Sequence, residues 1–169
     1  MTSVSVTEAR KRLYALIDEV GQSHEPVQIN GKRSNAVLLS EGDWRAIQET
    51  LHLVSIPGMR ESILEGMATA PAELSSEPGW CAGPFYSLKQ AQKDVRKLAS
   101  ASPVLKLKAQ ELLELLRVDP LQQPPPCGAL VGDLRGVCSR RINIQHRLIF
   151  QVLEQERIVK VLRLWSHYD

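Results

Sequence analysis

The spacing of apolar residues divides the first part of the chain into a strand, a helix and a hairpin. A short apolar run at Ser3–Val6 is typical of a strand, and Thr7 is the expected N-cap of the helix that follows. Two short β runs then flank Asn30-Gly31, a dipeptide favoured in hairpin turns. In the helix the apolar residues recur three or four positions apart, which places them on one face; they are Ala9, Leu13, Leu16, Ile17 and Val20.

Two further helices are predicted before the middle of the chain. Ser40 and Asp43 are spaced as an N-terminal cap for a helix that continues to about Val54. Another helix starts after Pro57, and this half of the chain is too small to bury all of its apolar residues. They form a stripe that needs a partner surface. The stripe consists of Ile56, Met59, Ile63, Leu64 and Met67.

The second half predicts two helices packed on a sheet. A short β run near Trp80–Tyr86 precedes helices at about Ser87–Ala99 and Val104–Arg117. The prolines of "LQQPPP" end the helical pattern, and strands with short turns follow. Such strands form an antiparallel meander, and helices on one of its faces give an α+β domain. The expected strands are Gly136–Ile142, His146–Leu153 and Arg157–Trp165.

A Pro-containing stretch poor in large apolar residues, "MATAPAELSSEPG", separates the two halves. We therefore predict an N-terminal domain over 1–67, a linker over 68–79 and a C-terminal domain over 80–169. Charge is divided in the same way. Residues 1–79 hold seven basic and eleven acidic residues, whereas the rest of the chain holds fourteen basic and eight acidic ones. Two such halves attract each other, or the basic half binds nucleic acid.

Composition excludes several other classes of protein. Three cysteines without CxxC spacing and four scattered histidines predict neither a disulfide framework nor a metal site. The chain shows no signal peptide and no apolar run of membrane-spanning length. We therefore expect a cytoplasmic protein that uses no metal, no cofactor and no membrane.

The stretch "SRRINIQHRLIF" carries three arginines and a histidine within a strand-like pattern. A turn near Asn143–Gln145 would place Arg140 or Arg141 within cross-strand reach of Arg147. An arginine fork can donate two hydrogen bonds to a phosphate, so this cluster favours an anionic ligand. His146 follows the apolar parity of its neighbours and is expected to pack or to orient the turn.

Two long segments resemble families that are normally separate proteins. "SVTEARKRLYALIDEV", "EPVQINGKRSNAVLLSEGDWRAIQETLHL" and "IPGMRESILEGM" resemble the Phd/YefM antitoxins over residues 1–70. "KQAQKDVRKL", "GDLRG", "SRRINIQHRLIFQVL" and the terminal "WSHYD" resemble the YoeB branch of the RelE-like toxins over about 85–169. The resemblance implies a fusion, natural or constructed, in which a Phd/YefM-like α/β domain precedes a RelE-like toxin domain.

The toxin resemblance implies metal-independent, ribosome-dependent cleavage of mRNA, in which a ribose 2′-hydroxyl attacks the neighbouring phosphate. It assigns Arg141 and Arg147 to the scissile phosphate, His167 to the general acid and Tyr168 to a nucleotide base. An imidazole suits proton transfer near neutral pH, and aromatic rings stack on the bases of single-stranded RNA.

One position departs from the toxin pattern. These toxins usually carry a catalytic glutamate shortly before "GDL", where this chain has Gly128 within "CGAL". Asp133, five residues further on, needs a different loop path to replace it. Losing a general base typically costs about 10²–10⁴ in rate. We therefore expect a toxin half that is attenuated or inactive.

The antitoxin resemblance implies a dimer that binds operator DNA, and a helical segment that wraps the toxin. The stripe from Ile56 to Met67 then docks on the toxin half, either within one chain or between the two chains of a dimer. Basic side chains that contact DNA phosphates bind with strong salt dependence. The candidate DNA contacts lie in the first helix and the hairpin loop, and they are Arg10, Lys11, Lys32 and Arg33.

Three interpretations stay open at this point. The first is a fused antitoxin–toxin whose ribonuclease half is held silent. The second is a DNA-binding autorepressor in which the toxin-like domain has only a structural, corepressing role. The third is an artificial joining of two natural proteins.

Overall fold

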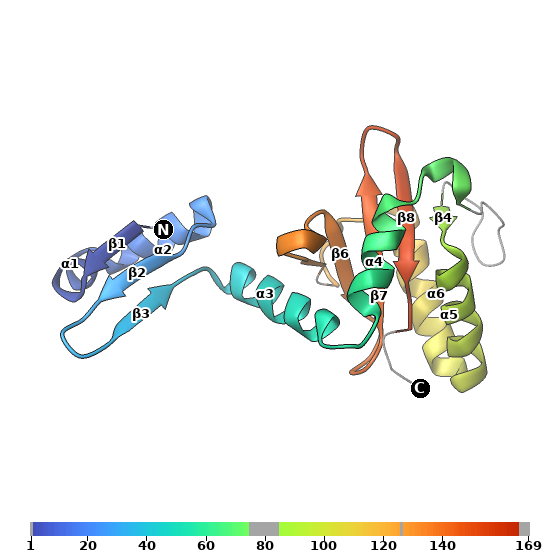
Figure 1. Cartoon of the computed structure of the whole chain (residues 1–169), viewed down its shortest axis with the longest axis horizontal. Coiled ribbons are helices and arrows are strands. Elements are labelled where there is room, and N and C mark those ends of the chain that lie inside the picture. Colours follow the sequence, from blue (N-terminus) through green and yellow to red (C-terminus); the bar gives the residue numbers. More distant parts are fainter. Residues whose placement is uncertain (1, 75–84, 126, 166–169) are drawn as a thin grey trace. The chain divides into compact units, whose positions relative to one another are not determined.

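The computed structural model forms two compact units, Met1–Gln48 and Glu49–Asp169 (Figure 1). The structure describes residues 2–74, 85–125 and 127–165. Each unit has its own sheet and its own apolar core. Among the described helices, none has the length and apolar character needed to cross a membrane.

The first unit is a three-stranded sheet with two short helices packed on it. The middle strand pairs in parallel with the first strand and antiparallel with the third, which confirms the predicted hairpin around Asn30-Gly31. A small core holds the helices on the sheet and contains Ala9, Leu16, Val20 and Val27. The elements are β1 (Thr2–Ser5), α1 (Val6–Lys11), α2 (Leu13–Ser23), β2 (Val27–Asn30) and β3 (Asn35–Leu38).

The first predicted helix differs from the structure in its start and its continuity. Its N-cap is Ser5 rather than Thr7, because the Ser5 hydroxyl accepts a hydrogen bond from the Glu8 amide at 3.2 Å. The helix is interrupted at Arg12, whose φ of −127° is not helical. This break shifts the helical phase, so the predicted face is not buried as a whole. Leu13 and Ile17 are 45% and 49% exposed.

The second unit is built around a five-stranded sheet in the order β4-β8-β7-β6-β5. β6, β7 and β8 form the predicted antiparallel meander, while β4 joins its edge in parallel with β8. The helix from Glu41 to Val54 begins in the first unit, and its predicted cap is present, since the Ser40 hydroxyl accepts a hydrogen bond from the Asp43 amide at 3.1 Å. The elements from there on are α3 (Glu41–Val54), α4 (Met59–Ala68), η1 (Pro71–Glu73), β4 (Phe85–Ser87), α5 (Lys89–Ala101), α6 (Pro103–Val118), β5 (Gly128–Ala129), η2 (Gly132–Leu134), β6 (Val137–Arg141), β7 (Arg147–Leu153) and β8 (Ile158–Arg163).

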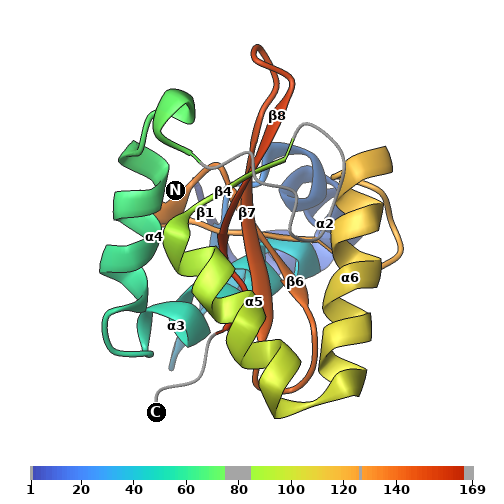
Figure 2. The same ribbon diagram turned by 90° about the vertical axis from the view of Figure 1, so that its right-hand side faces the viewer.

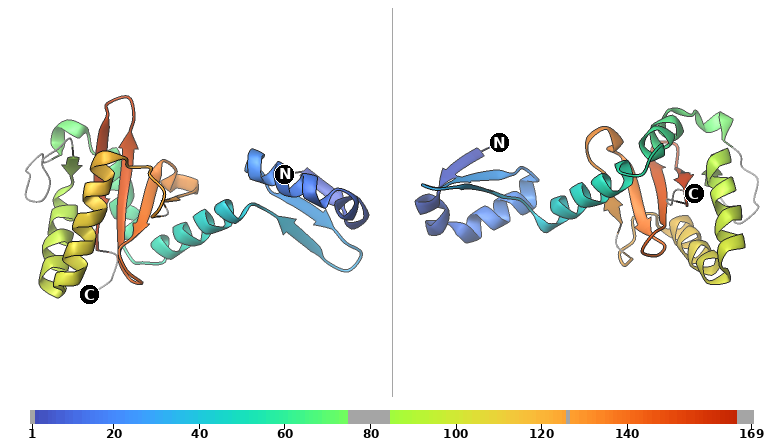
Figure 3. Two further views of the ribbon diagram at one scale, coloured as in Figure 1. Left: turned by 180° about the vertical axis from the view of Figure 1, so that it is seen from behind. Right: turned by 60° about the horizontal axis from the view of Figure 1, so that its bottom comes forward.

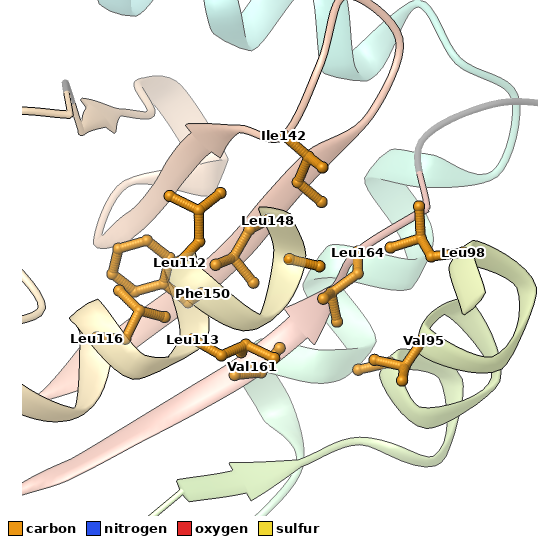
Figure 4. Packing of buried hydrophobic residues seen from close by; sticks show 12 residues of the cluster. Val95, Leu98, Leu112, Leu113, Leu116, Ile142, Leu148, Phe150, Val161 and Leu164 are labelled. Atoms are coloured by element: carbon orange, nitrogen blue, oxygen red, sulfur yellow. The ribbon is translucent and has the colours of Figure 1, made fainter. Parts of the chain in front are cut away.

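The two predicted toxin helices, α5 and α6, cover one face of this sheet, as the α+β prediction required (Figure 2). Their apolar sides meet the alternate residues of β7 and β8 that point toward them. Figure 4 shows this packing from close by, with Phe150 and Leu148 between the helices and the sheet. The buried cluster contains Ala91, Val95, Leu98, Ala109, Leu112, Leu113, Leu116, Ile142, Leu148, Phe150, Val161 and Leu164.

The other face of the sheet is covered by residues 49–74, which we call the covering segment (Figure 3). It consists of the second part of α3, then α4 and η1. Helix α4 lies very close to the sheet, since a Cβ added at Gly66 would come within 3.1 Å of Leu162 Cδ2 on β8. The cluster that joins segment and sheet contains Leu53, Met59, Ile63, Leu130, Leu134, Val137, Ile149 and Leu162.

The predicted stripe therefore has its partner surface within the same chain. Met59 and Ile63 are buried, and the other members, Ile56, Leu64 and Met67, are partly buried against the same cluster. This docking explains why the second compact unit begins at Glu49 instead of in the Pro-containing stretch. The predicted domain limits, 1–67, 68–79 and 80–169, describe chain organisation and stay a prediction.

Candidate active site

Two arginines face each other across β6 and β7, at the end next to the connecting turn. Arg141 pairs directly with Arg147 in the register of the two strands, as the sequence indicated. The turn is fixed by Asn143, whose side-chain oxygen accepts hydrogen bonds from the amides of Gln145 at 2.9 Å and His146 at 2.6 Å. We call Arg141 and Arg147 the arginine site.

Arg147 is held from two sides. Its Nη1 atom donates to the carbonyl oxygens of the turn, at 3.0 Å for Asn143 and 3.2 Å for Ile144. Its Nε atom donates to Glu49 Oε1 of the covering segment at 2.7 Å. Arg147 is only 4% exposed, whereas Arg141 is exposed. The arginine expected to bind phosphate thus already has a carboxylate partner in the intact chain.

Glu49 also contacts β6, the strand that pairs with the missing glutamate position on β5. Ser139 Oγ on β6 donates to the same Glu49 oxygen at 2.7 Å. Ser139 is paired with Gly128 of β5, and a Cβ added at Gly128 would lie 3.6 Å from Glu49 Cγ. Glu49 therefore lies next to Gly128, the position where the toxin resemblance expects a catalytic carboxylate.

Arg140 points to the opposite face and has a structural role. It is fully buried, and its guanidinium donates to the carbonyls of Pro125 at 2.9 Å and of Pro120 and Gln122 at 2.8 Å. These bonds hold the proline-containing loop that precedes β5. Of the two arginines left open by the sequence, Arg141 is therefore the one that lies beside Arg147.

Of the histidines and the tyrosine considered for this site, the structure describes His146. His146 is buried, with its ring stacked on Trp165 at a centroid distance of 4.2 Å, so it packs as the sequence indicated. His167 and Tyr168 lie outside the described residues. Their predicted roles as general acid and base-stacking group stay predictions.

Two further cations of the sheet are bound by the covering segment. Lys160 on β8 donates to the carbonyl oxygen of Met67 at 3.0 Å, and burial lowers the pKa of its amine. Arg163 donates to Ser62 Oγ at 3.1 Å and to the buried Asp94 on α5 at 2.6 Å. The segment therefore supplies an oxygen acceptor to each of three cations, Arg147, Lys160 and Arg163.

The two glutamates of α4, Glu61 and Glu65, lie at the surface. Glu61 pairs with its neighbour Arg60 at 3.8 Å and is exposed, as is Glu65. Asp133 of η2 forms an ion pair with Arg60 of α4, which links η2 to the covering segment. Glu49 was missed by sequence reasoning. The available signal was its spacing of four residues from Leu53, which places both on one helical face.

The two described cysteines lie on the face away from the arginine site. Cys127 and Cys138 are free thiols that pack against the cluster under α5 and α6. The hydrogen bond to Cys138, together with burial, raises the pKa of Cys127, and the same bond lowers the pKa of Cys138. Strand residues alternate between faces. Cys138 therefore lies on the opposite face of β6 from its neighbour Ser139, which binds Glu49.

In the first unit, the predicted DNA contacts lie at the surface, in the last turn of α1 and in the hairpin loop. Ser5, just before α1, pairs with Asn30, just before the hairpin loop, so helix start and loop are neighbours. Arg12 is partly shielded between two glutamates, at 3.5 Å from Glu8 and 3.7 Å from Glu19. The four candidate residues are all exposed: Arg10, Lys11, Lys32 and Arg33. We call them the basic patch.

Known structures resemble each part of the chain. The YoeB–YefM complex from Staphylococcus aureus aligns with 52% of this chain and 100% of its own, at 27% identity and a TM-score of 0.46. The YefM antitoxin of Mycobacterium tuberculosis aligns with 41% of this chain and 100% of its own, at 39% identity and a TM-score of 0.36.

Sequence comparison assigns the two parts to families. Residues 1–73 match the family described as antitoxin Phd_YefM of type II toxin–antitoxin systems, and residues 85–169 match the ParE toxin of such systems. The antitoxin YefM of Streptomyces coelicolor is 40% identical over 75 residues, which span 44% of this chain and 86% of that protein. YefM of Mycobacterium bovis is 41% identical over 66 residues, which span 39% of this chain and 72% of that protein. The chain therefore belongs to two families at once, as a Phd/YefM antitoxin fused to a toxin of the ParE/RelE family.

Proposed function

We propose that the toxin half is a metal-independent mRNA endoribonuclease that acts at the ribosome, and that the covering segment keeps it silent. The observation that supports this is the 2.7 Å contact between Glu49 and Arg147, the arginine expected to bind the scissile phosphate. Arg147 is nearly inaccessible while this contact exists. A phosphate can reach it only after the covering segment leaves.

The proposed chemistry assigns one task to each group. Arg141 and Arg147 stabilise the charge on the phosphate, His167 protonates the leaving oxygen, and Tyr168 stacks on a base of the mRNA. Gly128 offers no proton acceptor for the 2′-hydroxyl. We therefore propose an attenuated enzyme, whose arginines and histidine leave at most slow cleavage.

The Ile63→Asp variant of the full chain tests this proposal. Ile63 is fully buried between α4 and the sheet. Removing a buried isoleucine costs about 2–5 kcal/mol, and burying a carboxylate in its place costs more. The covering segment should leave the sheet, and slow cleavage should appear. The measurement is mapping of mRNA cuts in a translating extract, with the unaltered chain giving none.

Leu51→Asp is the matched control, because it adds the same charge to the same segment at a side chain that is 60% exposed. It should behave like the unaltered chain. Cleavage by the unaltered chain as fast as by Ile63→Asp would contradict silencing by the covering segment.

We also propose that the antitoxin half dimerises and binds operator DNA through the basic patch, which makes the cytoplasm its place of action. Two features of the first unit support this. The four basic residues are all exposed, and α2 exposes apolar residues that a second copy could cover, including Tyr14 at 87%. The exposed apolar residues of this unit include Val6, Leu13, Tyr14, Ile17 and Val37.

Loss of the basic patch should weaken DNA binding in a salt-dependent way. Arg10→Ala and the double variant Lys32→Ala/Arg33→Ala should each lower affinity for the DNA upstream of the coding sequence. The slope of log K against log salt should fall by about 0.9 for each phosphate contact removed. Arg45→Ala removes an exposed arginine of α3 outside the patch and should change neither quantity. Equal effects of all three variants would contradict the patch as the DNA site.

A second function is favoured by Gly128 itself. A toxin domain without its general base can serve as a corepressing structural domain of a DNA-binding autorepressor. In that case the Ile63→Asp chain stays inactive on mRNA, even with a glutamate at position 128, while DNA binding persists.

A further inference from the structure

Position 128 and Glu49 share one small region of the site. Glu49 Oε1 accepts hydrogen bonds from Arg147 Nε and from Ser139 Oγ, both at 2.7 Å. A Cβ at position 128 would touch Glu49 Cγ at 3.6 Å and Glu49 Cβ at 3.9 Å. These are ordinary contact distances, so a side chain can start there. Any longer side chain must then extend beside the Glu49 carboxylate.

Two carboxylates do not fit this region as well as one. Cross-strand partners point to the same face, so a glutamate at 128 would project on the face where Ser139 meets Glu49. Arg147 already donates its Nε to Glu49 and its Nη1 to the turn carbonyls of Asn143 and Ile144. A second negative charge close to the first is unfavourable when both are partly removed from water.

We propose that Glu49 and a carboxylate at position 128 are mutually exclusive, so that the glycine is what allows this chain to hold its own antitoxin segment closed. In the closed state Glu49 supplies the single carboxylate of this region. Gly128 adds neither a side chain that would occupy the same space nor a second negative charge. The missing side chain is thus a determinant of intramolecular docking as well as a loss to catalysis. This inference rests on the proposed silencing by the covering segment and specifies how that silencing is secured.

Its test is a double-mutant cycle in the full chain, read by amide hydrogen exchange of α4, with no RNA present. The chains are the unaltered protein, Gly128→Glu, Glu49→Gln and the double variant. Gly128→Glu should speed exchange across α4 about ten-fold or more, because neighbours in one network are typically coupled to this extent. In the Glu49→Gln background the same substitution should have a clearly smaller effect.

Two controls separate charge from volume. Gly128→Ala adds only the Cβ and should leave exchange nearly unchanged. Gly128→Gln has the size of glutamate without its charge and should speed exchange less than Gly128→Glu does. If Gly128→Glu does not fold, recovery of folding by Glu49→Gln supports the proposal, and failure to recover contradicts it.

The inference would be overturned if Gly128→Glu and Gly128→Gln speeded exchange of α4 equally. It would also be overturned if Gly128→Glu had the same effect on exchange in the Glu49→Gln background as in the unaltered chain. Either result is independent of mRNA cleavage. A chain that cleaves no mRNA can still show the coupling, and an active chain can lack it, so failure of this proposal is distinguishable from failure of the proposed enzyme.

Discussion

Gly128→Glu, introduced into the Ile63→Asp chain, is expected to raise mRNA cleavage by about 10²–10⁴-fold, the usual contribution of a general base. Position 128 is paired with Ser139, whose hydroxyl shares an acceptor with Arg147. A glutamate there emerges on the face of the sheet that holds the arginine site. It can then accept the 2′-proton next to the phosphate that Arg147 binds. Cut mapping in a translating extract, followed over time, measures the change in rate.

Gly128→Gln in the same Ile63→Asp background is the control for this gain. Glutamine has nearly the same size but cannot accept the proton, so it should leave the slow rate unchanged. If neither variant cleaves mRNA, the arginines and histidine no longer form a working site. The autorepressor with a structural toxin domain is then the function that remains.

Asp94→Asn should cost the second unit about 3–5 kcal/mol of folding stability, the typical result of breaking a buried ion pair on one side. Asp94 is 1% exposed. Its Oδ2 atom accepts hydrogen bonds from Arg163 Nε at 2.6 Å and from the Leu164 amide at 3.1 Å. Without the carboxylate, the Arg163 guanidinium keeps its charge in a mostly buried place. Urea unfolding of the full chain measures the loss.

An exposed pair on the neighbouring helix provides the control. Glu111→Gln removes the partner of Lys108 on α6, where both side chains are about half exposed or more. Such surface pairs contribute about 0–1 kcal/mol, so this variant should unfold close to the unaltered protein. A loss for Asp94→Asn as small as that for Glu111→Gln would show that the buried pair does not hold α5 on the sheet.

Local sequence signals predicted most of the secondary structure. Helical patterns that end at prolines predicted α5 and α6. Short turns predicted that β6, β7 and β8 are neighbours in the sheet, in that order. These signals depend on residues a few positions apart, which is why they can be recognised without a tertiary structure. The interrupted first helix was missed, because the backbone conformation of Arg12 leaves no clear mark in the apolar pattern.

The candidate site was predicted in part. The opposed pair Arg141 and Arg147 followed from strand register, which the turn at Asn143 fixes locally. The partner of Arg147 did not follow, because Glu49 is 98 positions away in the chain. Nothing in the local charge pattern distinguishes Glu49 from Glu61 or Glu65, which lie on the same segment and stay exposed.

By itself, the sequence determined the α+β class, the antitoxin–toxin order and the need of the stripe around Ile63 for a partner, since periodicity and motif spacing are carried by neighbouring residues. Only the tertiary structure decided which surface that partner is and which carboxylate reaches Arg147. The reason is physical. Docking depends on the fit of a helix face to a sheet, down to the missing side chains of Gly66 and Gly128, and such complementarity exists only once distant segments are folded together.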